Sequence, residues 1–212
     1  MSRTMRIGTA AAIAVGIAVL ALGGIYYLTN AGAPASGNGL AGKYPIAVGS
    51  PGPGQEAPPI ELPSTDGGTF DLASERGETV LLYFQEGLMC QPCWDQITDM
   101  ESQSGKFKAL GIDKTVSITS DPLGALKQKV ESEGISTPVL SDPNLAVSKT
   151  YDANSYGMMG GSRNGHTFIV VGPEGEIKWR ADYGGPPDYT MYVPVENLLA
   201  DMREGLDKAP SK

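Results

Sequence analysis

The chain has 212 residues and a formal net charge of −8, which argues against nucleic acid or an anionic lipid surface as a partner. It contains only two cysteines, Cys90 and Cys93, and one histidine, His166. Its length leaves about 150 residues for a single domain after the atypical N-terminal segments described next.

The first segment is apolar: residues 7–29 contain no charged side chain. As a helix rising 1.5 Å per residue they would span about 34 Å, enough for a hydrocarbon core of ~30 Å. Basic residues precede this run and none follows until Lys43. We therefore expect residues 1–29 to be a transmembrane anchor in the cell membrane, with its N-terminus cytoplasmic and the rest extracytoplasmic. A signal peptide cleaved near Ala33-Pro34-Ala35 is the alternative, although the run exceeds the usual apolar region of roughly 7–15 residues.

Residues 30–56 are dense in Gly, Pro, Ala and Ser, which predicts a flexible linker. Beyond it, residues 57–208 are the expected catalytic domain. A cysteine pair outside the membrane lies in an oxidising compartment. A dithiol there needs reductant from elsewhere, and a membrane-bound electron donor is a candidate partner.

Strand and helix patterns alternate along this domain. In chain order we expect a hairpin over 60–72, a buried strand at 79–84, a helix from Gln91 to about Leu110, a strand at 116–119, a helix capped by Asp121, a short strand at 138–140, a short helix after 142–143, two paired strands at 166–171 and 176–183, and a final helix at 194–206. This order implies an α/β fold with a mostly parallel central sheet flanked by helices, and an antiparallel hairpin at one edge.

The two cysteines lie where the buried strand at 79–84 ends and a helix begins. Residues three apart share a helix face, so a Cys90–Cys93 disulfide needs little backbone movement. The unpaired N–H groups and dipole at a helix start favour a thiolate. This predicts thiol–disulfide exchange, in which Cys90 attacks and Cys93 resolves. Pro92 is compatible with the first turn of a helix. A structural zinc site is disfavoured because it usually needs four ligands. A c-type haem site is disfavoured because it needs a histidine where this chain has Trp94.

The succession from Ala57 to Leu206 resembles the thioredoxin superfamily. It is most similar to the redoxin branch, which holds the AhpC/TSA peroxiredoxins and the TlpA/ResA/DsbE-type membrane-anchored thiol–disulfide oxidoreductases. The resemblance is carried by residues 57–62, residues 66–70, the strand leading into Cys90-Gln91-Pro92-Cys93, and residues 167–170 before Pro173-Glu174-Gly175. It implies a thioredoxin-like fold with a central mixed sheet, no cofactor, and protein thiols or disulfides as substrates.

The chain departs from the peroxiredoxin pattern at several positions. Peroxiredoxins resemble one another in a Thr or Ser three residues before the attacking cysteine and a Pro four residues earlier, where this chain has Gly87 and Tyr83. Their arginine before the late strand falls at Gly165, with Arg163 two residues away. A peroxidase is therefore the less favoured function.

The TlpA-like proteins carry a cis-proline before the late strand, and its equivalent here is Gly165 or His166. Gly165, Pro92 and Trp94 are the candidate substrate-binding residues. Glu86 and His166 are candidate proton-handling neighbours of the cysteines, although Glu86 is also consistent with a solvated charge at a strand end.

Sco-type copper chaperones are also similar, because they combine two cysteines on this loop with one histidine before an aromatic strand. That resemblance implies an alternative in which Cys90, Cys93 and His166 bind copper, although those chaperones have three residues between the cysteines and this chain has two. Four methionines are possible soft ligands that we interpret instead as core or loop residues: Met89, Met158, Met159 and Met191. The aromatic loop at 183–192 is a candidate binding rim with no predicted position relative to the cysteines.

Overall fold

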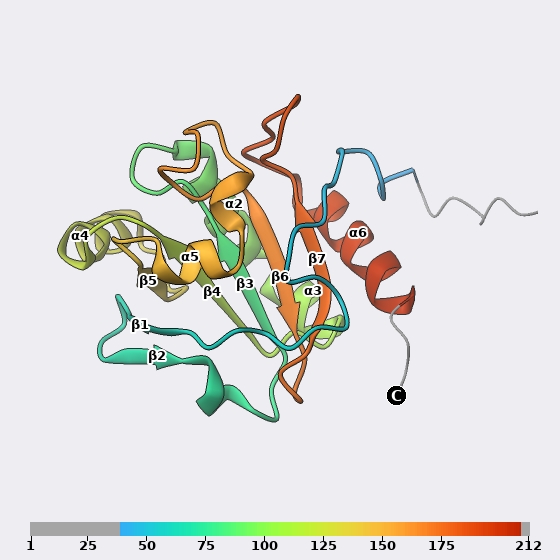
Figure 1. The fold of residues 1–212 in the computed structure, drawn as a ribbon, viewed down its shortest axis with the longest axis horizontal. Coiled ribbons are helices and arrows are strands. Elements are labelled where there is room, and N and C mark those ends of the chain that lie inside the picture. Colours follow the sequence, from blue (N-terminus) through green and yellow to red (C-terminus); the bar gives the residue numbers. More distant parts are fainter. Residues whose placement is uncertain (1–38, 209–212) are drawn as a thin grey trace, which may run out of the picture. The chain divides into compact units, whose positions relative to one another are not determined.

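The computed structural model describes residues 39–208, which belong to one compact unit (Figure 1). The predicted membrane anchor at residues 1–29 lies outside the described residues. Within residues 39–208, no helix is long and apolar enough to cross a membrane.

A five-stranded mixed sheet with the order β5-β4-β3-β6-β7 forms the centre of the unit (Figure 1). Its strands are β3 (Val80–Phe84), β4 (Lys114–Thr119), β5 (Val139–Ser141), β6 (Thr167–Val171) and β7 (Ile177–Asp182). The pairs β3–β4 and β4–β5 are parallel, whereas β3–β6 and β6–β7 are antiparallel. The mixed sheet is confirmed, but the expectation of a mostly parallel one is wrong. Residues 142–166 bring the chain back to the C-terminal end of β3. The strand β6 therefore starts at that end and runs antiparallel to β3, the central strand.

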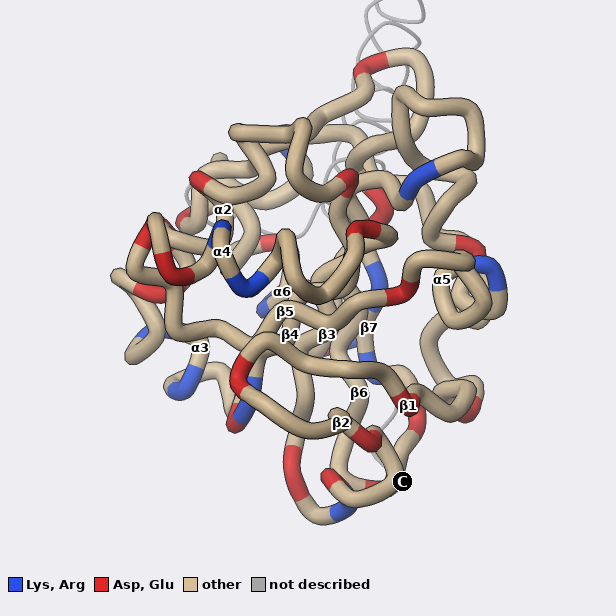
Figure 2. The backbone as a smooth tube through the Cα atoms, turned by 90° about the vertical axis from the view of Figure 1, so that its left-hand side faces the viewer, with Lys and Arg blue, Asp and Glu red and all other residues tan. Residues whose placement is uncertain are grey.

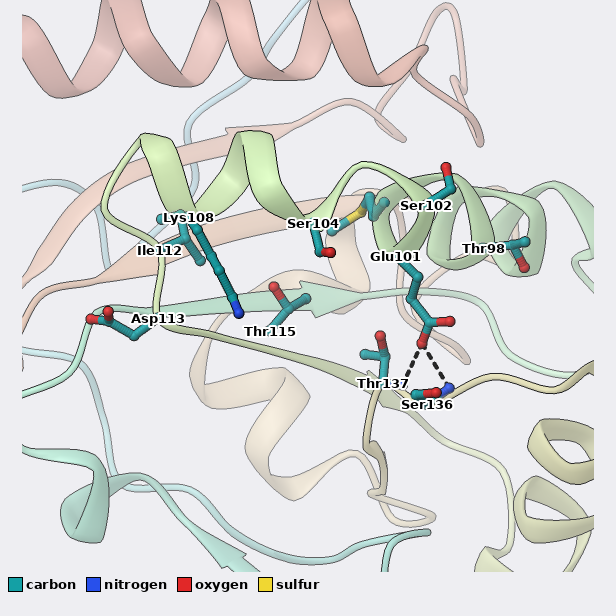
Figure 3. Close-up of a pocket in the computed structure, with 11 residues that line it drawn as sticks. Thr98, Glu101, Ser102, Ser104, Lys108, Ile112, Asp113, Thr115, Ser136 and Thr137 are labelled. Atoms are coloured by element: carbon teal, nitrogen blue, oxygen red, sulfur yellow. Dashed lines mark hydrogen bonds between the residues drawn. The ribbon is translucent and has the colours of Figure 1, made fainter.

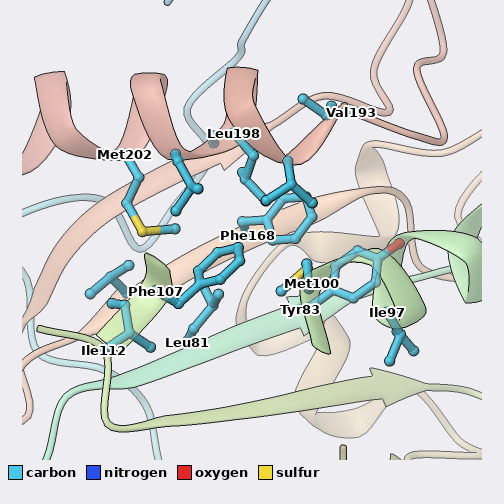
Figure 4. Close-up of a cluster of buried hydrophobic side chains, with 14 of the residues drawn as sticks. Leu81, Tyr83, Ile97, Met100, Phe107, Ile112, Phe168, Val193, Leu198 and Met202 are labelled. Atoms are coloured by element: carbon cyan, nitrogen blue, oxygen red, sulfur yellow. The ribbon is translucent and has the colours of Figure 1, made fainter. Parts of the chain in front are cut away.

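Alternate residues of β3 feed two apolar cores on opposite faces of the sheet, which explains why this strand is buried throughout. Leu81 and Tyr83 join the core under α2 (Gln91–Ser102), α3 (Ser104–Ala109) and α6 (Val195–Lys208), seen in Figure 4. Leu82 and Phe84 join the second core. That core is covered by the hairpin β1 (Glu61–Pro63) and β2 (Thr69–Asp71), by η1 (Leu72–Glu75), and by the chain around α5 (Ala146–Thr150) and η2 (Ala153–Ser155).

The helix expected from Gln91 to about Leu110 is divided into α2 and α3. The break falls at Gln103, whose φ of −116° is not helical. The Ser and Gly residues around it have weaker helix propensity than Ala or Leu, so little local preference opposes the break. The predicted apolar face is confirmed, since Ile97, Met100 and Phe107 are all buried.

Residues 39–56, assigned from composition to the linker, pack on the domain instead. Ala47 forms a bridge with Asp182 at the edge strand β7. The Arg180 guanidinium, itself paired with Asp182, donates a 3.0 Å hydrogen bond to the Pro51 carbonyl. This segment covers an edge that would otherwise offer unpaired backbone groups. Residues 39–56 therefore belong to the same compact unit as the domain expected from residue 57.

Candidate active site

Cys90 and Cys93 form a disulfide with their Cα atoms 5.3 Å apart. Cys90 is the N-cap of α2 and Cys93 lies in its first turn, together with the exposed Pro92. The predicted placement of both sulfurs at a helix start is confirmed. Cys90 is 6% exposed and Cys93 is fully buried, so Cys90 is the one of the two cysteines that has any exposed surface.

The sheet topology brings three distant loops to the disulfide. Because β3 and β4 are parallel, the residues that follow them emerge at the same edge of the sheet. Because β6 is antiparallel to β3 and pairs Thr167 with Phe84, the residues preceding β6 arrive there as well. Residues 85–90, 120–122 and 156–166 are neighbours for this reason (Figure 1).

Glu86 is buried at this edge, with 6% of its surface exposed, so it is not a solvated strand-end charge. Its Oε1 accepts a 3.0 Å hydrogen bond from the Met158 N–H, and its backbone carbonyl accepts one of 2.9 Å from Arg163. Burial, and secondarily the Glu86 carboxylate, raise the pKa of Tyr83 well above its usual range. A proton-handling role for Glu86 stays a prediction.

Asp121 does not cap a helix as expected. The helix α4 (Leu123–Glu133) follows Pro122 without a side-chain cap. The buried Asp121 carboxylate instead accepts hydrogen bonds from the Leu88 N–H at 2.8 Å, from the Thr119 hydroxyl at 3.1 Å and from Arg163 at 2.9 Å. The local sequence is compatible with either role. Here the carboxylate is taken up by donors from the loop before Cys90, from the end of β4 and from the loop that carries Arg163.

Gly87 is required where it stands. Its φ is +99°, and a Cβ atom there would lie 1.7 Å from Oδ2 of Asp121. The position that carries Thr or Ser in peroxiredoxins thus has no room for a side chain in this chain. The Gly87 carbonyl accepts a 3.1 Å hydrogen bond from the Trp94 indole N–H. This bond holds the peptide between Gly87 and Leu88, whose N–H is bound by Asp121.

Of the three residues predicted to bind substrate, only Pro92 is exposed. Trp94 is fully buried, so the prediction of a substrate platform is not supported, and its indole serves the loop instead. Gly165 is buried against Tyr156, whose carbonyl oxygen would lie 1.3 Å from a Cβ at that position. This close backbone approach accounts for the glycine.

His166 is completely buried, and its Nδ1 lies 2.9 Å from the Tyr83 hydroxyl. That hydroxyl is also 3.5 Å from the Cys93 carbonyl oxygen, so it stands between the ring and the cysteine backbone. Burial lowers the pKa of His166 to about 3. An imidazole that is uncharged at neutral pH is a poor proton donor there, which argues against the predicted role.

Met191, interpreted from the sequence as a core or loop residue, is also a neighbour of the disulfide. It packs with Cys90 and Cys93 in a small buried cluster. The loop that carries it is fixed to α2, since the Val193 N–H donates a 2.8 Å hydrogen bond to Oε1 of Gln96. Its contact with the disulfide depends on the path of a turn-rich loop, and no local pattern marks it.

The copper alternative needs Cys90, Cys93 and His166 to come together. Within residues 39–208, no group of three or more His, Cys, Asp and Glu residues could hold a metal ion. The Nδ1 atom of His166 faces Tyr83 instead. The Sco-like resemblance therefore has no support in the arrangement of these residues.

A hollow of mixed polar and apolar lining lies between α2, α3, residues 112–115 and residues 136–137 (Figure 3). The Glu101 carboxylate spans part of it, accepting hydrogen bonds from the Ser136 and Thr137 N–H groups. None of the residues that line it belongs to the disulfide site. Along the backbone seen in Figure 2, Lys and Arg positions are interspersed with Asp and Glu positions.

A mixed sheet with a CxxC disulfide at the start of the helix that follows its central strand defines a thioredoxin-like redoxin domain. Residues 53–180 match the AhpC/TSA family, and the chain belongs to that family. This agrees with the redoxin resemblance of the sequence.

The relatives that match include proteins of two kinds by name. "Putative peroxiredoxin Rv2521" of Mycobacterium tuberculosis (strain ATCC 25618 / H37Rv) is 32% identical over 130 residues, which cover 59% of this chain and 81% of the relative. "Thiol-disulfide oxidoreductase ResA" of Bacillus subtilis (strain 168) is 28% identical over 138 residues, which cover 65% and 69%. Among solved structures, Peroxidoxin BcpB from Mycobacterium tuberculosis has a TM-score of 0.59 at 19% identity, covering 72% of this chain and 97% of that one.

Proposed function

We propose that the protein is a membrane-anchored, extracytoplasmic thiol–disulfide oxidoreductase that acts on protein thiols or disulfides. The observation that carries the proposal is the Cys90–Cys93 disulfide at the start of α2, in which Cys90 alone is accessible. The similarity to two ResA proteins, at 28% and 27% identity, supports the same class of reaction.

In the reducing direction, the Cys90 thiolate attacks one sulfur of a substrate disulfide. A mixed disulfide forms between Cys90 and the substrate, and the other substrate sulfur leaves as a thiolate. Cys93 then attacks the Cys90 sulfur, which closes the Cys90–Cys93 disulfide and releases the second substrate thiolate. Two electrons pass to the substrate, and a separate donor of two electrons must restore the dithiol. The oxidising direction runs the same steps in reverse.

The anchor and the location outside the membrane rest on the uncharged apolar run at residues 7–29 and the basic residues before it. Expression with a reporter fused after residue 212 tests both. The full chain should sediment with membranes, and external protease should digest the fused domain in intact cells without an outer barrier. A soluble or protected reporter would contradict the location.

Trapping tests the exchange chemistry. The Cys93→Ser variant should accumulate mixed disulfides with protein substrates, detected as reducible adducts on Cys90. The Cys90→Ser variant should form none and should lose the reduction of insulin completely. Equal adduct formation by both variants would contradict the assigned roles.

Family membership and the relative named as a peroxiredoxin favour a second candidate, a thiol peroxidase. Cys90 would take an oxygen from a hydroperoxide to give a sulfenic acid and an alcohol or water, and Cys93 would condense with it and release water. The space at Gly87 occupied by Asp121 counts against this function. Rapid turnover of hydrogen peroxide with a dithiol reductant would reverse the ranking.

A further inference from the structure

We propose that Asp121 and Arg163 are positioning residues that fix the backbone leading into Cys90 and thereby favour the disulfide form of the pair. We call these two residues the loop clamp. This inference rests on the proposed thiol–disulfide exchange and adds what sets its equilibrium.

The clamp holds the loop at two peptides. The Asp121 Oδ2 accepts the Leu88 N–H at 2.8 Å, two residues before Cys90. The Arg163 guanidinium donates to the Glu86 carbonyl at 2.9 Å and to the Asp121 Oδ1 at 2.9 Å. The Asp121–Arg163 ion pair, which joins two loops distant in sequence, therefore binds the loop before Cys90 at the peptide on each side of Gly87.

The glycine between these two peptides belongs to the same arrangement. Any larger residue at Gly87 would collide with the Asp121 carboxylate. The Gly87 carbonyl in turn accepts the Cys90 N–H at 3.0 Å. A continuous path of hydrogen bonds thus joins the ion pair to the backbone of the attacking cysteine.

The clamp is well placed to affect the redox equilibrium because reduction changes the distance between the sulfurs. Once the bond is broken, the two sulfurs move to non-bonded separation through rotation of the cysteine side chains, together with whatever shift of the loop before Cys90 its hydrogen bonds allow. The clamp is formed in the disulfide state described here and restrains that loop. Loss of the clamp should therefore favour the dithiol.

The equilibrium with glutathione measures this directly. One disulfide and two glutathione molecules convert to one dithiol and one glutathione disulfide. We expect Asp121→Ala and Arg163→Ala to raise the equilibrium constant for reduction about tenfold, equivalent to about 30 mV for a two-electron couple. Arg163→Lys keeps the charge but not the fork of donors, so it should fall between wild type and Arg163→Ala. The full chain is used, and the thiol content is read by alkylation and mass spectrometry.

Arg76→Ala is the control, because Arg76 forms an exposed ion pair with Glu56, at 3.5 Å, that involves none of the residues of the loop clamp. It should leave the constant unchanged. The free energy of unfolding is measured in parallel for every variant, and Asp121→Asn replaces Asp121→Ala if the latter does not fold. Constants within twofold of wild type in Asp121→Asn and Arg163→Ala, whatever their stability, would overturn the proposal. A wild-type disulfide that does not exchange with glutathione at all would instead contradict the proposed function itself.

Discussion

Two Arg–Asp ion pairs, Arg180–Asp182 on β7 and Arg163–Asp121 in the loop clamp, differ in burial and geometry. Arg180 and Asp182 are fully buried and joined by two contacts, of 2.8 and 2.9 Å. In the loop clamp, Arg163 is 28% exposed and meets Asp121, 5% exposed, through one contact of 2.9 Å. The bidentate pair is the stronger and more rigid arrangement.

The groups each pair holds differ as well. Arg180 also donates to the carbonyls of Pro51 and Tyr151, and so fastens the N-terminal segment to β7, away from the cysteines. The clamp fastens the loop before Cys90. We therefore expect the Arg180–Asp182 pair to stabilise the fold, and the loop clamp to position the sulfur of Cys90.

The largest expected effect is on stability, at the buried pair. Arg180→Ala leaves the Asp182 carboxylate buried without its partner and should lower the free energy of unfolding by about 3–5 kcal/mol. Denaturant titration of the wild type and the variant measures it. The glutathione equilibrium of the folded variant should match wild type, and a shift as large as that of Arg163→Ala would remove the distinction between the pairs.

Gly87→Ala should displace the Asp121 carboxylate and so disrupt the loop clamp. The added Cβ meets Asp121 Oδ2, and φ is positive at this position, so we expect a loss of about 2–3 kcal/mol of unfolding free energy together with a shift toward the dithiol. In the double variant with Asp121→Ala the steric part disappears. The two changes should therefore cost less together than the sum of their separate costs. Simple additivity would show that the contact is not made.

His166 contrasts with both ion pairs because its buried ring lies among aromatic side chains and is hydrogen-bonded to the Tyr83 hydroxyl, not to a carboxylate. Its pKa is about 3 when folded and about 6.5 when unfolded, so between these values the unfolded state binds the extra proton. Stability from this group is complete above pH 6.5 and is lost as the pH falls toward 3, by about 2 kcal/mol between pH 6.5 and pH 5. His166→Gln should show a correspondingly shallower loss on acidification in denaturant titrations. Parallel curves would contradict the assignment.

An exposed pair gives the baseline. Lys208 and Glu204 lie one helical turn apart and are each at least half exposed. Glu204→Gln should change the free energy of unfolding by less than about 0.5 kcal/mol and leave the glutathione equilibrium unchanged. A larger effect would mean that ion pairs in this protein are stronger than their exposure suggests.

The elements that follow from local sequence were predictable. The apolar run at 80–84, the turn at Pro173–Gly175 and the face of α6 each carry a strong periodic or turn signal, and all appear where expected. The cysteine pair was predictable for the same reason, since strand, CxxC and helix are contiguous. The break at Gln103 was not, because Ser and Gly lower helix propensity without forbidding a helix.

What the sequence could not supply is the contact between distant loops. Asp121 before Pro122 fits a helix cap as well as it fits a clamp, and only the parallel pairing of β3 and β4 decides between them. Arg163 and Met191 reach the site through loops of irregular path. The Gly/Pro-rich segment at 39–56 also misleads, since its backbone is held by partners on β7.

The accessibility difference between the two cysteines tests the central claim most directly. The reduced full chain is treated with a limiting alkylating reagent under native conditions, and each cysteine is quantified by mass spectrometry over a range of pH. We predict that Cys90 is modified first, with a midpoint below the ~8.5 of a free thiol, and that Cys93 reacts only slowly. Preferential labelling of Cys93, or no labelling of either cysteine before unfolding, would contradict the account.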